Sequence, residues 1–577
     1  MMLGPVNWAG RLTTAWVGLI GVACVIRAGN ALFPQHRAGL FAGLVLAAFY
    51  WDINFSRFGI PPILTAMATA GTMGAVWQGV RTGQRASYAL AGMCLAIGLY
   101  SYVPFRLFVV VPLVTGLALL ITQPALQRRS ILTGGLVMAD VAFILYIPLL
   151  TFFIQNPAWF LNRFGQTTQD TLGAASRYQT LLENARLTLD GLFFSGDQNW
   201  RHNLSTRPAL DSVQSLFFLL GIAASLRRWR SAETWTLITW LLVGLTPSVI
   251  TVEAPHFGRT TMVTPAVALT MAWGIQTAWD TVSRRWVRGL IGVALGLSFL
   301  LTVRDYFVRW ANDPNVLPAF NTQQVWLADT LRTAPSGAAL YVTPMDYRDD
   351  FWTFEYVLGS ETFKRFRVFN GRKCLVLPSA TMAGAMYAVI VHEDPSTLAS
   401  LAQRFPTGTI ARPSAPADHE YLNTYLIPDG PATLGGASAA HANFGDMVAL
   451  ADYALSKETI APGSSVTLSV AWAIKQPTPL PYKVFVHFVG APQADGNTIY
   501  AQYDGPPCAS SYPTWQWQPG ETWRDAYSLT LPNALPPGEY RLHIGWYHET
   551  SGTRLPLHDA LGQPVGDAFQ IVSVSLP

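Results

Sequence analysis

Long runs of apolar residues follow one another over the first half of the chain and stop near residue 303. Crossing the hydrocarbon core of a bilayer takes roughly 20 apolar residues in a helix, and most of these runs approach that length. The pattern therefore predicts a multi-pass bundle of about ten transmembrane helices over residues 1–310. The runs lie at 8–33, 38–54, 60–80, 86–104, 105–123, 131–154, 211–227, 233–252, 261–280 and 287–303.

The segment 320–428 has a different pattern, without any run long enough to span a membrane. Short β-type runs at 338–343, 374–377 and 386–392 alternate with helical stretches near 322–333, 351–358 and 396–404. This alternation predicts a small α/β unit. No glycine-rich phosphate loop follows any of these runs, so we predict no nucleotide site.

The last segment, 440–577, alternates apolar and polar residues in the manner of β-strands. The clearest stretches are 467–472, 483–489, 527–531 and 540–547, with Pro-Gly turns between them. They predict an antiparallel β-sandwich. Its aromatic residues either fill the core and rim or form a face that stacks on carbohydrate, and we favour the first interpretation. The residues concerned are Trp515, Trp517, Trp523, Trp546 and Tyr547.

Composition agrees with a membrane protein, since 50% of the 577 residues are hydrophobic and only 12% are charged. The net charge of +4 comes without any stripe of Lys or Arg, so we predict no nucleic-acid partner. The four cysteines show no CxxC pair and no metal-ligand spacing. Buried free thiols are the favoured interpretation, and a Cys374–Cys508 disulfide is the alternative.

Arginines in the loops between the apolar runs predict the orientation. Cytoplasmic loops are enriched in Lys and Arg, and one set of alternate loops is the richer: 34–37, 81–85, 127–129, 227–230 and 284–288. The other set, which includes the long loop 155–210, then lies outside. We therefore expect a multi-pass protein of the cell (plasma) membrane whose soluble segments are extracytoplasmic. The first helix would also begin outside, so a cytoplasmic N-terminus would need one more helix before Met1.

Three arginines on the predicted outer side, Arg57, Arg106 and Arg259, run against this charge bias. A guanidinium binds phosphate through two hydrogen bonds and keeps its charge, so these residues are candidates for holding a membrane-borne phosphate. The alternative is that each one extends to lipid headgroups. Further candidates for binding substrate lie beside them, at Tyr100, Tyr102 and His256.

The long outer loop adds a dense polar segment with Asp197, Arg201, His202 and Asn203, which are candidates for gripping a sugar or a phosphate. Asp140 lies within the sixth apolar run, and we favour a satisfied polar contact inside the bundle. Such buried charges are few, which argues against a secondary transporter. We find no HExxH, GxSxG, Walker A or dinucleotide motif and predict neither a metal nor a cofactor.

Taken together, several motifs resemble bacterial GT-C glycosyltransferases, the group of the protein O-mannosyltransferases and the lipid A aminoarabinose transferase. Each motif is modestly specific, whereas their order and spacing extend over nearly the whole chain. The matching segments are 11–21, 55–60, 98–106, 196–211, 482–488, 512–515 and 545–547.

The resemblance implies an inverting hexosyl or pentosyl transferase. Such an enzyme moves a sugar from a polyprenyl-phosphate donor in the membrane lipid to an extracytoplasmic glycan, lipid or protein acceptor. Arg57, Arg106 and Arg259 would stabilise the phosphate as it leaves.

The chain departs from the family at its start. In the family a first helix and an acidic catalytic loop precede the segment that matches 11–21, and here only Met1–Trp8 precede it. We therefore expect the catalytic base upstream of Met1 and little activity from this chain alone. The alternative is a non-catalytic membrane protein that binds lipid-linked sugar or carbohydrate; a transporter is the third interpretation.

Overall fold

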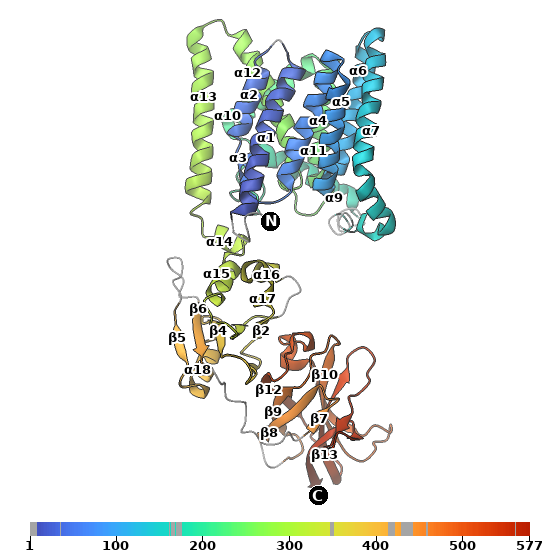
Figure 1. The fold of residues 1–577 in the computed structure, drawn as a ribbon, viewed down its shortest axis with the longest axis vertical. Coiled ribbons are helices and arrows are strands. Elements are labelled where there is room, and N and C mark those ends of the chain that lie inside the picture. The colour runs from blue at the N-terminus through green and yellow to red at the C-terminus, as the bar shows by residue number, and fades with distance from the viewer. Residues whose placement is uncertain are drawn as a thin grey trace. The chain divides into compact units, whose positions relative to one another are not determined.

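The chain forms two compact units in the computed structural model, Met1–Phe320 and Asn321–Pro577 (Figure 1). The first is helical and the second carries the β-sheets. The structure describes residues 8–34, 36–160, 162, 165, 168, 176–346, 351–412, 422–428, 442–456, 460–559 and 561–577.

Most helices of the first unit correspond to apolar runs of the sequence, but α9 (Arg177–Phe193) lies within the predicted long loop 155–210, which is a correction. Among the described residues, four stretches are long and apolar enough to cross a membrane: Ala9–Leu32, Val103–Thr122, Ala125–Gln155 and Arg285–Trp310. The pair α2–α3, bent by 59°, is a fifth if it forms one broken span. These spans support a membrane protein, and the count of ten stays a prediction. The elements are α1 (Ala9–Leu32), α2 (Ala38–Ala47), α3 (Tyr50–Phe58), α4 (Pro62–Thr82), α5 (Arg85–Ser101), η1 (Val103–Val109), α6 (Val110–Thr122), α7 (Ala125–Gln155), α9 (Arg177–Phe193), α10 (Ser212–Arg227), α11 (Ala232–Val249), η2 (Thr261–Val263), α12 (Thr264–Thr281), α13 (Arg285–Val303), η3 (Arg304–Trp310) and α14 (Val316–Ala319).

Helices at the centre of this unit pack against other helices. Small residues let their backbones approach closely: a Cβ at Gly221 of α10 would lie 1.9 Å from the carbonyl oxygen of Thr270 in α12. By contrast, α7 and α13 lie on two flanks (Figure 1), and only 6% and 17% of their apolar windows are buried. Asp140 is exposed on α7, so the predicted contact inside the bundle is wrong.

The second unit begins with a five-stranded sheet in the order β2-β1-β4-β6-β5. Strand β1 is parallel to β2 and β4, whereas β6 runs antiparallel to β4 and β5. Helices and strands alternate here as the pattern predicts. The elements are α15 (Thr322–Leu331), β1 (Ala339–Thr343), α16 (Trp352–Leu358), α17 (Ser360–Phe363), β2 (Phe366–Val368), β3 (Leu375–Leu377), β4 (Ala385–Ile390), α18 (Pro395–Arg404), β5 (Thr409–Ala411) and β6 (Leu422–Ile427).

Two antiparallel sheets follow, in the orders β15-β14-β7-β8-β9-β12-β3 and β11-β10-β13-β16. Strand β3 belongs to this pair of sheets, since it pairs with β12, and not to the α/β sheet for which the sequence predicted it. The remaining elements are β7 (Ala442–Phe444), β8 (Val448–Leu455), β9 (Ser465–Ile474), β10 (Tyr482–Val489), β11 (Ile499–Gly505), η4 (Pro507–Ser510), η5 (Thr514–Gln516), β12 (Thr522–Thr530), β13 (Gly538–His548), β14 (Leu557–His558), β15 (Pro564–Gly566) and β16 (Phe569–Leu576).

The aromatic residues of the sandwich lie mostly in its core. Trp517, Trp523 and Trp546 are fully buried, and their rings pack against one another with centroids 4.9–6.3 Å apart. The core interpretation is therefore confirmed for these three residues. Trp515 is 47% exposed and remains on the surface.

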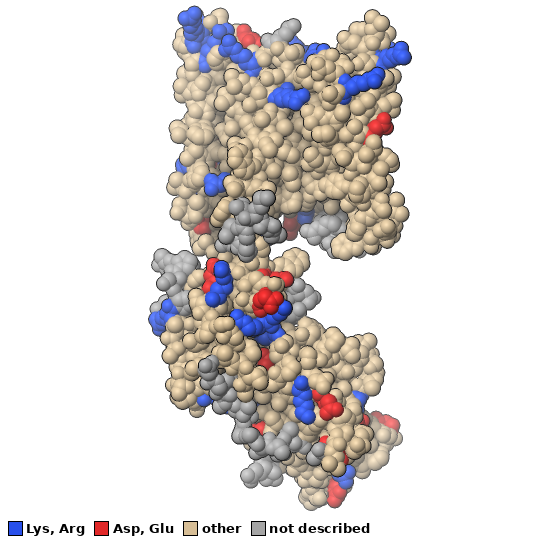
Figure 2. All heavy atoms as spheres, in the orientation of Figure 1, with Lys and Arg blue, Asp and Glu red and all other residues tan. Residues whose placement is uncertain are grey.

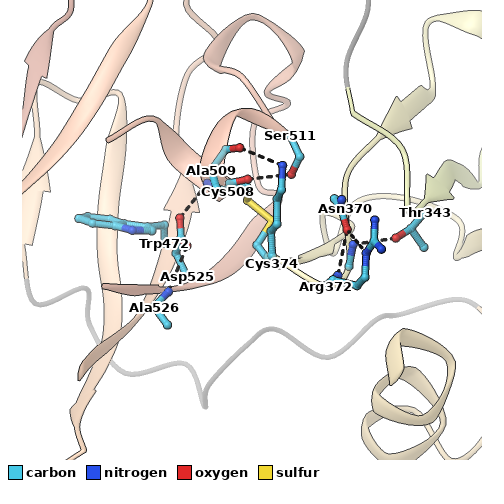
Figure 3. The surroundings of a disulfide bond; sticks show 12 residues. Thr343, Asn370, Arg372, Cys374, Trp472, Cys508, Ala509, Ser511, Asp525 and Ala526 are labelled. Carbon is cyan, nitrogen blue, oxygen red and sulfur yellow. Dashed lines mark hydrogen bonds between the residues drawn. A yellow bond between two sulfur atoms is a disulfide. The ribbon is translucent and has the colours of Figure 1, made fainter. Parts of the chain in front are cut away.

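A disulfide joins Cys374, just before β3, to Cys508 in η4 (Figure 3). The favoured prediction of free thiols is therefore wrong for this pair, whereas Cys24 and Cys94 are free. The two bonded residues are separated by 134 positions in the sequence. Their proximity follows from the pairing of β3 with β12.

Candidate functional site at one end of the helical unit

Hydrogen bonds from α3 hold two polar loops at one end of the helical unit. Trp51 Nε1 donates to the carbonyl oxygen of Phe257 (3.1 Å), and Asn54 Nδ2 donates to that of Arg201 (3.1 Å). One loop joins α9 to α10 and the other joins α11 to η2. Because Trp51 and Asn54 belong to the same short helix, α3 fixes both loops together.

Asp197 is the centre of this arrangement, with a side chain only 5% exposed. Its Oδ1 accepts a hydrogen bond from the backbone N–H of Asn199 (2.8 Å). Its Oδ2 accepts from the backbone N–H of Phe257 (2.8 Å) and pairs with His202 Nδ1 (3.0 Å). Burial alone would raise the pKa of the Asp197 carboxyl, but the hydrogen bond and positive potential of His202 hold it below the ordinary value.

The charge on Asp197 determines which nitrogen of His202 carries a proton. An ionised carboxylate only accepts hydrogen bonds, so His202 Nδ1 is the donor, and in the neutral form of the ring Nε2 carries the lone pair. A Cβ at Gly258 would lie only 3.3 Å from Nε2, so glycine at this position avoids a close contact with the imidazole.

His256 stands beside His202, with ring centroids 4.7 Å apart. Its Nδ1 accepts a hydrogen bond from the backbone N–H of Arg259 (3.2 Å). Burial, followed by the nearby His202 and Arg259, lowers the pKa of His256 to about 3. The ring is therefore neutral with its proton on Nε2, so the two imidazoles offer one hydrogen-bond acceptor and one donor.

Asp197, His202 and His256 each place a ligand atom within 4.8 Å of the other two, which is the donor set of a divalent cation such as Zn²⁺. Nothing in the sequence spacing indicates this combination, because it joins two loops. As arranged, both oxygens of Asp197 already accept hydrogen bonds. An ion would therefore replace the bond between Asp197 and His202.

The three predicted phosphate-binding arginines have different surroundings. Arg259 lies next to His256 and donates from Nη1 to the carbonyl oxygen of Val252 (2.6 Å). Arg57 is exposed at the end of α3, with its guanidinium carbon 5.5 Å from the ring centre of Tyr306. Phe55 and Phe58 of the same helix contact the ring of His202, whereas the guanidinium of Arg57 lies against Tyr306 and Phe307 of η3.

Arg106 contacts another part of the unit. It donates to the carbonyl oxygen of Phe160 (2.7 Å) and stacks over the rings of Phe153 and Phe160. Tyr100 also lies there, and its hydroxyl donates to the carbonyl oxygen of Leu145 in α7 (3.0 Å). Tyr102 lies between α5 and η1.

The other predicted residues of the long loop have structural contacts. Asn203 is buried, and its Nδ2 donates to the carbonyl oxygens of Asp197 (3.0 Å) and Arg207 (2.7 Å). Arg201 is exposed and donates from Nε to the carbonyl oxygen of Ala319. Asn203 therefore shapes the loop that presents Asp197 and His202.

A buried ion pair beneath this loop was not predicted. Arg207 Nε donates to Asp305 Oδ2 (2.9 Å), and the two side chains are only 6% and 8% exposed. The guanidinium of Arg207 also lies 4.3 Å from the ring centre of Tyr50. The sequence did contain a sign of this charged cluster, because Arg304, Asp305 and Arg309 directly follow the last apolar run.

The neutral state of His256 predicts a dependence of stability on pH. Between pH 6.5 and about 3 the unfolded chain binds a proton at this residue and the folded chain does not. Stability should therefore fall as the pH is lowered through this window, by about 1.4 kcal/mol per pH unit at most. Thermal unfolding of the wild type and His256→Gln tests this, and we expect a smaller slope in the variant. Equal slopes would contradict a neutral His256.

Comparison with known proteins gives matches only among solved structures, since neither a protein-family model nor a curated protein matches the chain. One match is the archaeal oligosaccharyltransferase AglB from Archaeoglobus fulgidus in complex with an inhibitory peptide and a dolichol-phosphate. It has 12% identity and a TM-score of 0.37, over 96% of this chain and 86% of that chain.

The Archaeoglobus fulgidus oligosaccharyltransferase in complex with Zn and sulfate also matches, with 12% identity and a TM-score of 0.37, over 95% of this chain and 86% of that chain. Arabinofuranosyltransferase AftD from Mycobacteria matches with 12% identity and a TM-score of 0.38, over 98% of this chain and 56% of that chain. These membrane glycosyltransferases belong to the GT-C class that the sequence resembles. At these TM-scores the likeness is one of general arrangement, so the proposed function rests on residues of this chain.

Proposed function

We propose that the protein transfers a sugar from a polyprenyl-phosphate donor to a hydroxyl group of an extracytoplasmic acceptor. The observation that carries the proposal is the cluster of Asp197, His202 and His256, with Arg259 beside His256, at the end of a membrane-spanning helical unit. Arg57 belongs to α3, the helix whose Phe55 contacts His202. The phosphate of a lipid whose chain lies among the helices would be at this level of the bilayer, and arginine and imidazole side chains there suit a phosphate-activated sugar.

The orientation of the site supports an extracytoplasmic acceptor. Figure 2 shows basic side chains gathered at one end of the helical unit, and they are arginines because the first lysine of the chain is Lys364. The candidate site belongs to the loops of the other end. By the bias of positive charge toward the cytoplasm, we place the site outside, in the plasma membrane.

The proposed reaction is a single displacement. The acceptor oxygen attacks the anomeric carbon and its proton passes to His202 Nε2. The bond from that carbon to the phosphate oxygen breaks, and the electron pair leaves with the polyprenyl phosphate. The configuration is inverted. Arg57, Arg259 and the Nε2–H of His256 would stabilise the charge that develops on the phosphate.

The arginines provide the direct test. Arg57→Gln and Arg259→Gln are expected to lower the rate of transfer about 10- to 100-fold, because each removes a charged hydrogen-bond donor to phosphate. Arg106→Gln should have a smaller effect, since Arg106 contacts Phe153 and Phe160. The measurement is transfer from a polyprenyl-phosphate sugar by the purified full chain, with Arg128→Gln as the control.

The outcomes separate the proposal from its alternatives. Unchanged transfer in both Arg57→Gln and Arg259→Gln would contradict the proposed phosphate site. A wild type that binds polyprenyl phosphate without transferring sugar would instead favour the non-catalytic binding protein. An equal loss in Arg106→Gln would return Arg106 to the phosphate site.

A further inference from the structure

A cleft of about 820 Å³ opens beside the candidate site, where the loop before α10 meets the end of α13. Its lining contains none of Asp197, His202, His256 or Arg259, so it is distinct from the histidine cluster. The cleft has one apolar wall and one strongly basic wall. A cleft with these two walls suits a ligand that has an apolar part and an anionic part.

The apolar wall comes from helices that belong to the membrane-facing part of the unit. Leu216 and Leu219, one turn apart on α10, are 56% and 55% exposed, and Phe194 is 77% exposed. Leu301 of α13 completes this wall. At the side of the cleft, the Ser298 hydroxyl of α13 donates a hydrogen bond to Asp211 and accepts one from Gln214, at the start of α10. These bonds hold the two helices together there. Such exposed apolar side chains suit a hydrocarbon chain.

The basic wall is formed by three arginines around one carboxylate. Asp305 accepts hydrogen bonds from Arg207 (2.9 Å), Arg304 (2.8 Å) and Arg309 (3.3 Å). The side chains of Arg304 and Arg309 are 54% and 56% exposed, so most of their donors face solvent or ligand. One negative charge against three positive charges leaves an excess of two.

A second carboxylate in the lining, Asp211, lowers the net charge of the cleft from plus two to plus one, and its oxygens are bonded to other groups. Asp211 Oδ1 accepts hydrogen bonds from the backbone N–H groups of Val213 and Gln214 (2.8 and 2.9 Å), which caps α10. Its Oδ2 accepts from Ser298 Oγ (2.6 Å). With the hydroxyls of Ser212 and Ser215, the basic wall offers mainly hydrogen-bond donors to an anion.

We propose that this cleft binds the phosphate headgroup of a membrane lipid, with its hydrocarbon chain along Leu216 and Leu219. Arg304 and Arg309 would bind the phosphate as guanidinium groups do, each through two N–H donors. A glycerophospholipid and a polyprenyl phosphate share this chemistry. The inference does not rest on the proposed sugar transfer, because it concerns other residues and is measured by binding.

The test is lipid binding by the full chain, purified in detergent and stripped of lipid, followed by native mass spectrometry. The ligands are phosphatidylglycerol, undecaprenyl phosphate and, as a lipid without phosphate, diacylglycerol. Removing two charged donors in Arg304→Gln/Arg309→Gln should weaken binding of a phosphate lipid at least about tenfold. The pair Arg284→Gln/Arg285→Gln is the matched control, since it removes the same charge from the other end of α13 and should not change binding.

A second variant tests the apolar wall without changing the charge. Leu216→Trp/Leu219→Trp fills the space along α10, and its side chains are exposed enough to be replaced without loss of the fold. It should weaken binding of the same lipid. Preference for phosphatidylglycerol identifies a phospholipid site, and preference for undecaprenyl phosphate identifies a site for the polyprenyl carrier. Equal affinity for diacylglycerol, or equal losses in the Arg284/Arg285 control, would overturn the proposal.

Discussion

His202→Ala is expected to lower the rate of sugar transfer by a factor of about 10²–10⁴, the usual contribution of a general base. The expectation follows from the hydrogen bond of its Nδ1 to Asp197 (3.0 Å), which fixes the ring and leaves Nε2 to accept a proton. Its side chain is 12% exposed, and the proposal requires that the acceptor approach the ring through this exposed part. Transfer should be measured at saturating donor, where the chemical step is observed.

A matched control exists at the opposite end of the same unit. His36 also pairs with a carboxylate, since its Nδ1 lies 3.5 Å from Asp280 Oδ2. His36→Ala should leave transfer unchanged. Added imidazole should restore part of the activity of His202→Ala, which a purely structural role would not allow. Equal rates in the wild type and His202→Ala would contradict the proposed base.

Asp197 should act through His202 and not on the substrate, because both of its oxygens are occupied by Asn199, Phe257 and His202. It is a positioning residue. Its carboxylate also joins the two loops of the site, so its replacement would disturb His256 as well. This is why His202, and not Asp197, is the informative position for a kinetic test.

Hydropathy predicted most helices of the first unit, but it missed α9, whose polar residues hide it within the long loop. It did not predict the break within 38–54, where α2 ends at Ala47 and α3 begins at Tyr50. The residues at the break are apolar like their neighbours, so hydropathy does not change there. Yet this break sets the direction of α3, which holds both site loops.

The site was predicted only where its residues are close in sequence. Asp197 and His202 stand five positions apart and were identified together, but their link to His256 depends on the backbone N–H of Phe257. The carboxylate of Asp305 was missed because it lies beyond the last apolar run. Contacts between distant segments are set by packing, which one sequence does not reveal.

Removing the Cys374–Cys508 disulfide is expected to destabilise the second unit by about 2–5 kcal/mol, toward the upper end because the enclosed loop is long. For a unit of this size, that corresponds to a fall in Tm of roughly 5–15 °C. The measurement is thermal unfolding of the full chain with Cys374→Ala/Cys508→Ala, followed by tryptophan fluorescence. Trp472, Trp517, Trp523 and Trp546 are all buried in that unit and report its unfolding.

The free cysteines provide the control, because Cys24→Ala/Cys94→Ala leaves the disulfide intact and should not change that transition. The same bond also tests the orientation of the chain. Disulfides persist in oxidising compartments and are rare in the cytosol. When the protein is taken from its own cells, denatured and alkylated without a reductant, Cys24 and Cys94 are expected to be the only cysteines modified. Alkylation of Cys374 and Cys508 as well would contradict both the bond and the extracytoplasmic location of the second unit.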